Sequence, residues 1–262
     1  GGKSVEVPTT MAQNFKVTPE QLEAAITPKT KLVILCSPSN PTGSVYSEAE
    51  LRALAAVLGK YPQVMVLADE IYEHINYIGG NFSIARCEEL KDRVCIINGV
   101  SKAYAMTGWR IGFVAAPLWL AKAITKLQGQ YTSGASSIAQ KAAEAAYTGS
   151  QQCVEDMREA FQRRRNLIVG RLREIPGLDV NEPDGAFYVF PGVTSFFGKK
   201  CGDVVINDAN DLAMYLLNEA HVATVSGDAF SCPGHIRMSY ATSDENIVEA
   251  TTRIAVALAK LQ

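Results

Sequence analysis

The sequence lacks the excess of basic residues typical of proteins that bind nucleic acid and the long apolar runs typical of membrane proteins. Its 25 lysines and arginines nearly balance its 27 aspartates and glutamates, for a formal net charge of −2. Proteins that bind nucleic acid through the phosphates need an excess of basic residues. No apolar run approaches the ~20 residues of a membrane-spanning helix, and no signal peptide is recognisable. We therefore expect neither a nucleic acid nor a membrane among its partners.

Cysteine and histidine are sparse as well. No two of the six cysteines have the close spacing of a zinc knuckle or a redox pair. The three histidines form no metal-binding pattern, and neither a Walker loop nor a nucleophile elbow is present. Unpaired thiols are typical of a reducing compartment, so we expect a cytoplasmic protein without a metal. The 262 residues are 47% hydrophobic, enough for one large domain or two smaller ones.

Short apolar runs alternate with helical stretches in the first half of the chain. Such runs predict strands at 31–36, 64–68, 94–98 and 111–115. Because each run is continuously apolar, we expect these strands to be buried on both faces. Between the first two, Ser47 and Glu50 form a capping box that predicts a helix up to Gly59. Strands interleaved with helices indicate an α/β layered sheet.

The second half begins with one long amphipathic segment, 151–175, whose apolar stripe predicts a helix packed on a core. The remainder is typical of a smaller α+β domain, with elements at 186–190, 208–220, 235–240 and from Asp244 onward. We therefore expect a large domain over 1–150 and a small C-terminal domain over 151–262, which starts with the long helix.

Polar side chains follow several predicted strands, at the edge where α/β sheets bind ligands. Lys102 comes after the strand 94–98, where apolar neighbours can free its amine as a nucleophile; a solvated lysine is the alternative. Asp69 ends a buried strand, where an unpaired carboxylate is costly. It either caps the next turn or holds a proton on a heterocyclic nitrogen. In a helical turn Tyr72 would face the same side as Asp69.

Four further residues suit the binding of anions or polar groups. Asn40 lies in a Ser-Asn-Pro-Thr-Gly turn, although turn chemistry alone would explain it. Ser101 and Arg110 suit a phosphate, with a surface salt bridge as the alternative for the arginine. Arg237 alternates with apolar residues along a predicted strand, so it points to the other face. There it either clamps a carboxylate or lies on an exposed strand face.

Together these segments resemble the class I aminotransferases that depend on pyridoxal phosphate, from end to end of the chain. The segments are Asn40-Pro41-Thr42-Gly43, Ala68-Asp69-Glu70-Ile71-Tyr72, Ser101-Lys102, Gly108-Trp109-Arg110-Ile111-Gly112 and Arg237. The stretch 99–110 is most similar to the aspartate aminotransferase subgroup of bacteria and plastids, which includes enzymes that also use prephenate. The resemblance implies a fold-type I transferase, with a mixed, mostly parallel sheet between helices and a smaller C-terminal α+β domain.

The resemblance also implies pyridoxal 5'-phosphate as cofactor and assigns the catalytic roles. Lys102 would form the internal aldimine and then carry the proton between substrate and cofactor. Asp69 would keep the pyridine nitrogen protonated, so that the ring acts as an electron sink. Tyr72 and Asn40 would hydrogen-bond the ring oxygen, and Asn40 would also lie beside the substrate.

The remaining roles concern anionic groups. Ser101 and Arg110 would hold the cofactor phosphate, and Arg237 the substrate α-carboxylate. The implied reaction is ping-pong amino-group transfer between an amino acid, aspartate, and a 2-oxo acid, 2-oxoglutarate, in a homodimer. The chain opens on Gly1-Gly2-Lys3 rather than methionine. We expect the phosphate loop, the ring-stacking aromatic residue, the partner subunit's tyrosine and the base for a second carboxylate to lie upstream of it.

Other functions fit the same motifs. A lyase acting at Cβ uses the same fold, the same lysine and the same aspartate, and a prephenate-preferring aminotransferase differs only in its substrate. A regulatory module that senses the cofactor without catalysis is the non-enzyme alternative. Such a module usually carries a DNA-binding arm, which the net charge of −2 does not favour.

Overall fold

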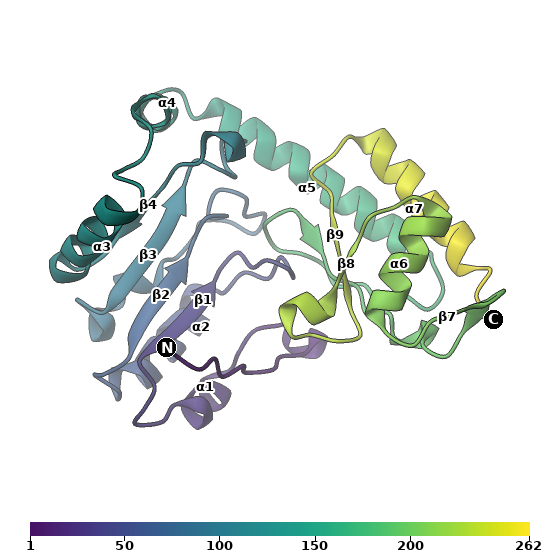
Figure 1. Ribbon diagram of the computed structural model, residues 1–262, viewed down its shortest axis with the longest axis horizontal. Helices are drawn as coiled ribbons and strands as arrows, with labels where there is room; N and C mark the ends of the chain where they lie inside the picture. The colour runs from purple at the N-terminus through teal and green to yellow at the C-terminus, as the bar shows by residue number, and fades with distance from the viewer. The chain divides into compact units, whose positions relative to one another are not determined.

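A computed structural model describes all 262 residues, and its contacts divide the chain into two units (Figure 1). The first unit comprises residues 1–7, 16–39 and 45–158. The second comprises residues 8–15, 40–44 and 159–262. Both units are discontinuous in sequence, and the short segment 40–44 belongs to the second although the chain on either side of it belongs to the first.

The first unit is built on a four-stranded sheet with the order β1-β2-β3-β4. Its strands are β1 (Leu32–Cys36), β2 (Met65–Asp69), β3 (Val94–Gly99) and β4 (Gly112–Ala115). The first three run parallel, and β4 is antiparallel to β3. The predicted strands and the mixed, mostly parallel sheet are therefore confirmed.

The first unit also contains four helices, which precede, separate or follow these strands in the sequence. They are α1 (Pro19–Ala25), α2 (Glu48–Gly59), α3 (Leu118–Tyr131) and α4 (Ser137–Thr148). The capping box at the start of α2 is confirmed. The Ser47 hydroxyl accepts a hydrogen bond from the Glu50 amide, and the Glu50 carboxylate accepts one from the Ser47 amide at 2.7 Å. Both bonds satisfy amides that the first helical turn leaves without a partner inside the helix.

The core of the first unit lies on one face of the sheet. Leu54 and Leu58 of α2 are buried against Val66 of β2 in one hydrophobic cluster. On the other face Ile34 is 66% exposed and Val114 of β4 is 38% exposed.

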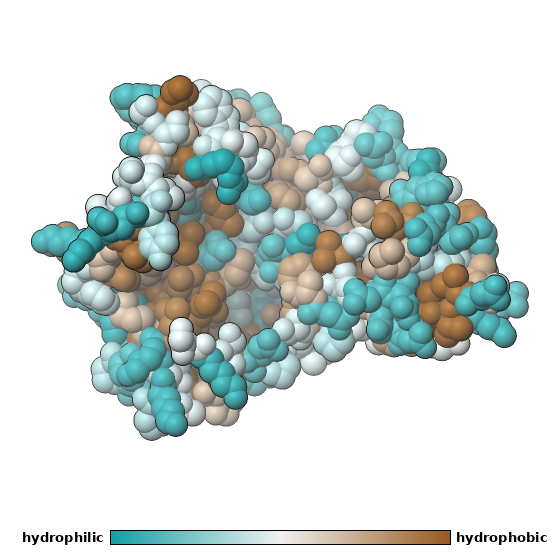
Figure 2. Space-filling model, in the orientation of Figure 1, coloured by the Kyte–Doolittle hydropathy of each residue, from teal (hydrophilic) through white to brown (hydrophobic).

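The prediction that the strands are buried on both faces is therefore wrong for β1 and β4, whereas β3 buries the consecutive residues Val94 and Cys95, which point to opposite faces. Alternate residues of β1 point to opposite sides, and only the side that faces α2 is covered. No residue of α3 is buried, and brown, hydrophobic surface lies over the strands of the first unit in Figure 2.

The second unit includes most of α5 (Gln152–Arg173), the long predicted helix, which starts within the first unit. Its main sheet has the order β5-β9-β8, with neighbouring strands antiparallel. The bounds are β5 (Tyr188–Val189), β6 (Lys200–Cys201), β7 (Val204–Val205), α6 (Ala209–Ala220), β8 (Val225–Ser226), β9 (Ile236–Ser239) and α7 (Asp244–Leu258). This α+β composition agrees with the prediction from the sequence.

Packing between α6 and α7 includes a buried hydrogen bond at 2.9 Å from the Tyr215 hydroxyl to the Ala257 carbonyl. Short 3-10 turns connect the larger elements: η1 (Met11–Gln13), η2 (Ile84–Arg86), η3 (Glu88–Leu90), η4 (Thr107–Trp109), η5 (Thr194–Phe196) and η6 (Gly227–Phe230). None of the helices combines the length and the apolarity needed to cross a membrane.

Candidate functional site

The carboxyl ends of β2 and β3 bring the first group of candidate residues to one edge of the sheet. Asp69 is the last residue of β2 and pairs in register with Cys36 of β1 and Ile97 of β3. One of its carboxylate oxygens accepts a hydrogen bond from the Ile71 amide at 3.2 Å. This local bond holds the carboxylate at the strand end, and its second oxygen has no protein partner.

Lys102 and Tyr72 meet at this edge. The Lys102 ammonium nitrogen lies 5.8 Å from the centroid of the Tyr72 ring, and Tyr72 is buried. Tyr72 follows β2, whereas Lys102 lies in the turn that follows β3. The parallel pairing of the two strands therefore joins an amine and a phenol that are distant in sequence.

The turn with Ser101 and Lys102 leaves β3 at a glycine that the structure requires. A Cβ added to Gly99 would lie 2.8 Å from the Cα of Gly112 on β4. Such a contact is closer than real Cβ atoms tolerate, so only glycine lets the ends of β3 and β4 approach in this way. Ser101 and Lys102 are both half-buried.

Arg110 links η4 to β4 and has a left-handed backbone, with φ at +52°. One guanidinium nitrogen donates to the Thr107 carbonyl at 2.8 Å. The residue is exposed and makes no salt bridge, so the surface salt bridge considered as an alternative is not formed. The other donors of the guanidinium have no protein acceptor.

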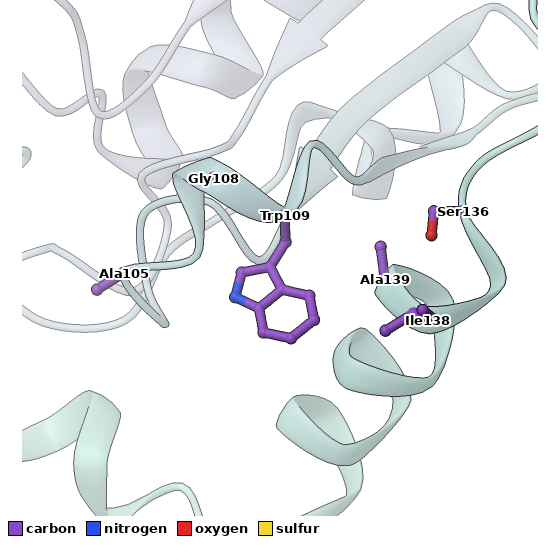
Figure 3. A pocket seen from close by; sticks show the side chains of 6 residues that line it. All are labelled: Ala105, Gly108, Trp109, Ser136, Ile138 and Ala139. Atoms are coloured by element: carbon purple, nitrogen blue, oxygen red, sulfur yellow. The ribbon is translucent and has the colours of Figure 1, made fainter.

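A cavity of about 580 Å³ borders the segment between Lys102 and Arg110 (Figure 3). Trp109 and Gly108 line one side, and the helix α4 supplies Ile138 and Ala139 on the other. The indole of Trp109 and the side chain of Ile138 are both largely exposed to it. The candidate segment therefore faces open space rather than the core.

Burial shifts the pKa of two groups in the first unit. It raises the pKa of the Glu70 carboxyl, and the Glu73 and Asp69 carboxylates add to the effect. Burial also raises the pKa of Tyr147 to about 12, with a further contribution from Tyr104. Both directions follow from the cost of removing a charge from water.

The second group of candidates lies in the second unit. One Arg237 guanidinium nitrogen donates to the Asn40 side-chain oxygen at 2.8 Å. The Arg237 Nε is buried and has no hydrogen-bond partner, and no carboxylate forms a salt bridge with this residue. As predicted, its neighbours Ile236 and Met238 on β9 point to the other face and are buried. Arg237 is only half-buried on its own face, where it keeps free donors for an anion.

Backbone contacts within the second unit hold the segment that carries Asn40. The Gly43 carbonyl accepts hydrogen bonds from the amides of Asp184 and Gly185, and the Asn181 side chain donates to the Thr42 carbonyl at 2.8 Å. Gly43 has φ at +72°, and a Cβ there would lie within clashing distance of the Pro183 side chain. The segment 40–44 is therefore fixed to the loop 181–185.

Sequence reasoning missed three residues of this second group. Asn181 was not singled out, nor were Tyr188 and Phe230, whose rings contact the Arg237 guanidinium. The only available signal was the aromatic run at 187–190 inside a predicted strand. The pattern did not indicate which ring would face Arg237, because that depends on the pairing of β5 with β9.

Comparisons with known proteins agree on one family. The family model described as aminotransferase class I and II matches residues 1–254. The aspartate/prephenate aminotransferase of Nitrosomonas europaea is 45% identical over 97% of this chain and 65% of that protein. The aspartate aminotransferase of Rhizobium meliloti is 48% identical over 99% of this chain and 64% of that protein.

Solved structures give the same result. The crystal structure of the Rhizobium meliloti aspartate aminotransferase has a TM-score of 0.93 at 47% identity, covering 97% of this chain and 64% of that one. A Thermus thermophilus aspartate aminotransferase with maleate has a TM-score of 0.88 at 39% identity, covering 97% of this chain and 63% of that one. The chain thus spans about two thirds of the length of the proteins it matches.

Proposed function

This chain belongs to the aminotransferase class I and II family, and from that membership and the site geometry we propose that it transfers amino groups with the help of pyridoxal 5'-phosphate. The observation that carries the proposal is the sheet edge where Lys102 lies beside Tyr72 and β2 ends in Asp69. The names of the relatives favour aspartate as amino donor. The resemblance of the motifs to the aspartate aminotransferase subgroup favours 2-oxoglutarate as acceptor.

The donor set at this edge fits the chemistry of that cofactor. Asp69 has a carboxylate oxygen without a protein partner, suited to a protonated ring nitrogen. Arg110 has guanidinium donors without acceptors, and Ser101 adds a hydroxyl, which together suit a phosphate. Bound there, the cofactor would supply an aldehyde for attachment and an electron sink for the reaction.

The protein's own side chains then handle protons and orientation. The Lys102 amine would act as the base that takes the proton from the substrate Cα and then gives it to the cofactor. The Tyr72 phenol, within contact of Lys102, would donate a hydrogen bond to the ring oxygen and help place the amine. Asp69 would keep the ring nitrogen protonated throughout the reaction, because a carboxylate stabilises the positive charge beside it.

Recognition of the substrate would fall to the second group. Arg237 is half-buried without a carboxylate partner, an arrangement that is costly unless an anion completes it. A substrate α-carboxylate supplies that anion, and a guanidinium binds it with planar, bidentate geometry. Asn40 accepts from one Arg237 nitrogen and leaves its own amide free to donate to the substrate or to the ring oxygen.

Other properties of the family extend the proposal. We infer a homodimer from the resemblance of the motifs to those of the bacterial and plastid subgroup, and a cytoplasmic location from the unpaired cysteines, which are typical of a reducing compartment. Prephenate is the second candidate substrate, because several relatives are named aspartate/prephenate aminotransferases. A prephenate-preferring enzyme would use the same Arg237, since both substrates present an α-carboxylate.

A product assay tests the reaction. Enzyme containing this chain is mixed with aspartate and 2-oxoglutarate, and we expect oxaloacetate and glutamate in equal amounts. A Cβ lyase would release pyruvate and ammonia or sulfide instead, and a cofactor-sensing module would form no product. Replacing 2-oxoglutarate by prephenate in a parallel reaction measures the second candidate substrate directly.

Lys102→Ala tests the attachment of the cofactor. We expect this variant to lose the visible absorbance of a covalently held cofactor, together with at least a thousandfold in kcat, because the base is gone. Lys141→Ala is the matched control, since Lys141 is exposed and only pairs with Glu144. An absorbance band unchanged in position in Lys102→Ala would assign the attachment to another lysine.

A further inference from the structure

We propose that Tyr188 and Phe230 are positioning residues that fix the plane of the Arg237 guanidinium for a carboxylate. The inference rests on the proposed function, because it assigns them to the recognition of its substrate. The guanidinium carbon lies 4.6 Å from the centroid of the Tyr188 ring and 5.0 Å from that of Phe230. Both distances are within the range in which a guanidinium is attracted to an aromatic face.

The two rings come from different elements that converge on β9. Tyr188 is buried on β5, which pairs antiparallel with β9 so that Tyr188 is opposite Ser239, two residues from Arg237. Phe230 is half-buried at the end of η6, just after β8 on the other side of β9. Both flanking strands of the sheet therefore lead to a ring that contacts the guanidinium.

The rings compensate for what Arg237 lacks. Its single hydrogen bond to Asn40 would leave the guanidinium free to rotate about that bond, and no carboxylate of the protein holds its charge. Aromatic faces supply partial negative charge and a flat surface without occupying the in-plane donors. The donors are thus left for a ligand, while the plane in which they point is fixed.

Packing around the rings supports a fixed position for them. The Phe230 ring meets Phe190 edge to face at 6.1 Å, and Phe190 stacks on His235 at 5.0 Å. Phe190 itself is fully buried, so Phe230 is held from behind by a rigid side chain. An orienting role requires this rigidity, because a mobile ring would not select one guanidinium plane.

The test compares ring removal with ring retention in the holoenzyme. Tyr188→Leu should raise the Kd for maleate and the KM for aspartate about tenfold, the scale of a partly desolvated cation–π contact, with a smaller change in kcat. Tyr188→Phe keeps the ring and should restore most of the lost affinity. Phe161→Leu is the matched control, because it removes a buried ring of the same unit that does not contact Arg237.

A second background separates positioning from general packing. In Arg237→Lys enzyme, which has no planar group to orient, Tyr188→Leu should change the maleate Kd less than twofold. The proposal would be overturned if Tyr188→Leu weakened maleate binding equally in the Arg237 and Arg237→Lys backgrounds. It would also be overturned if Phe161→Leu weakened maleate binding as much as Tyr188→Leu does. Phe230→Leu provides the same comparison at a half-buried site if Tyr188→Leu does not fold.

The experiment distinguishes this inference from the proposed function. A wild-type enzyme that neither binds maleate nor converts aspartate would contradict the function itself. A wild-type enzyme that does both, with Tyr188→Leu indistinguishable from Tyr188→Phe, would contradict only the positioning role.

Discussion

Glu70 is a buried carboxylate placed directly beside a candidate catalytic one. It is 7% exposed, and burial raises the pKa of its carboxyl, as do its acidic neighbours Asp69 and Glu73. A carboxyl whose pKa is raised by folding stabilises the fold below its unfolded pKa, and this contribution is lost as the pH rises through the folded value. At neutral pH Glu70 therefore destabilises the protein.

We expect Glu70→Gln to raise the free energy of unfolding at pH 8 by about 1–3 kcal/mol, the scale of one buried polar group relieved of its charge. The gain should vanish towards pH 4, where the carboxyl of the wild type is protonated as well. Urea unfolding at both pH values measures it. Glu155→Gln should show the opposite trend with pH, because Arg158 lowers the pKa of Glu155. A gain from Glu70→Gln that does not depend on pH would exclude the charge as its cause.

Single candidate residues could be selected from the sequence where a chemically reactive side chain comes at the end of a predicted strand. Asp69 and Lys102 each follow an apolar run, and the rule that strand ends form sites was enough to select them. Tyr188 was not predictable, because its role depends on which residue of β9 it faces, and strand register is a property of the fold. The resemblance to a family supplied the roles, which residue type alone left open.

At the scale of elements, two helices begin after an N-cap serine, and only one of these serines makes a side-chain capping bond. The Ser47 hydroxyl accepts from the Glu50 amide at the start of α2, whereas Ser136 precedes α4 without a side-chain capping bond. We expect Ser47→Ala to cost about 1 kcal/mol of stability and Ser136→Ala to cost almost nothing. Thermal unfolding of both variants checks this, with about 2–4 °C expected for the first. Equal shifts would show that the capping bond contributes nothing.

The same contrast explains which elements the sequence predicted. Helix α2 has a capping box and an apolar stripe on a core, so both its start and its buried face were readable. Helices α3 and α4 have neither: their N-caps make no side-chain bond and together they bury only Ala139. The apolar runs predicted the strand positions correctly but not the exposure of β1 and β4, because an apolar run does not say whether a second layer covers the strand.

At the scale of the molecule, the uncovered sheet face of the first unit has a measurable consequence. Ile34 is 66% exposed there, and Val114 of β4 is exposed on the same face. Contiguous apolar surface of this kind binds hydrophobic dyes and promotes association. We expect the 262-residue chain on its own to enhance the fluorescence of anilinonaphthalene sulfonate, and Ile34→Thr to reduce the signal by roughly a quarter or more.

Met214→Gln is the control for this experiment, because Met214 is 54% exposed on α6 of the second unit. The control should leave the dye signal nearly unchanged. A signal that falls equally in both variants would show that the dye binds scattered side chains rather than the sheet face of the first unit.

The membership of residues 40–44 in the second unit also constrains how this chain can be recombined with its relatives. A single crossover after residue 158 would import a foreign Arg237 counterpart while leaving the resident Asn40 in place. The donor and acceptor of the 2.8 Å bond would then descend from different parents. Chimeras that respect the contacts rather than the order of the gene would exchange residues 8–15 and 40–44 together with the C-terminal portion.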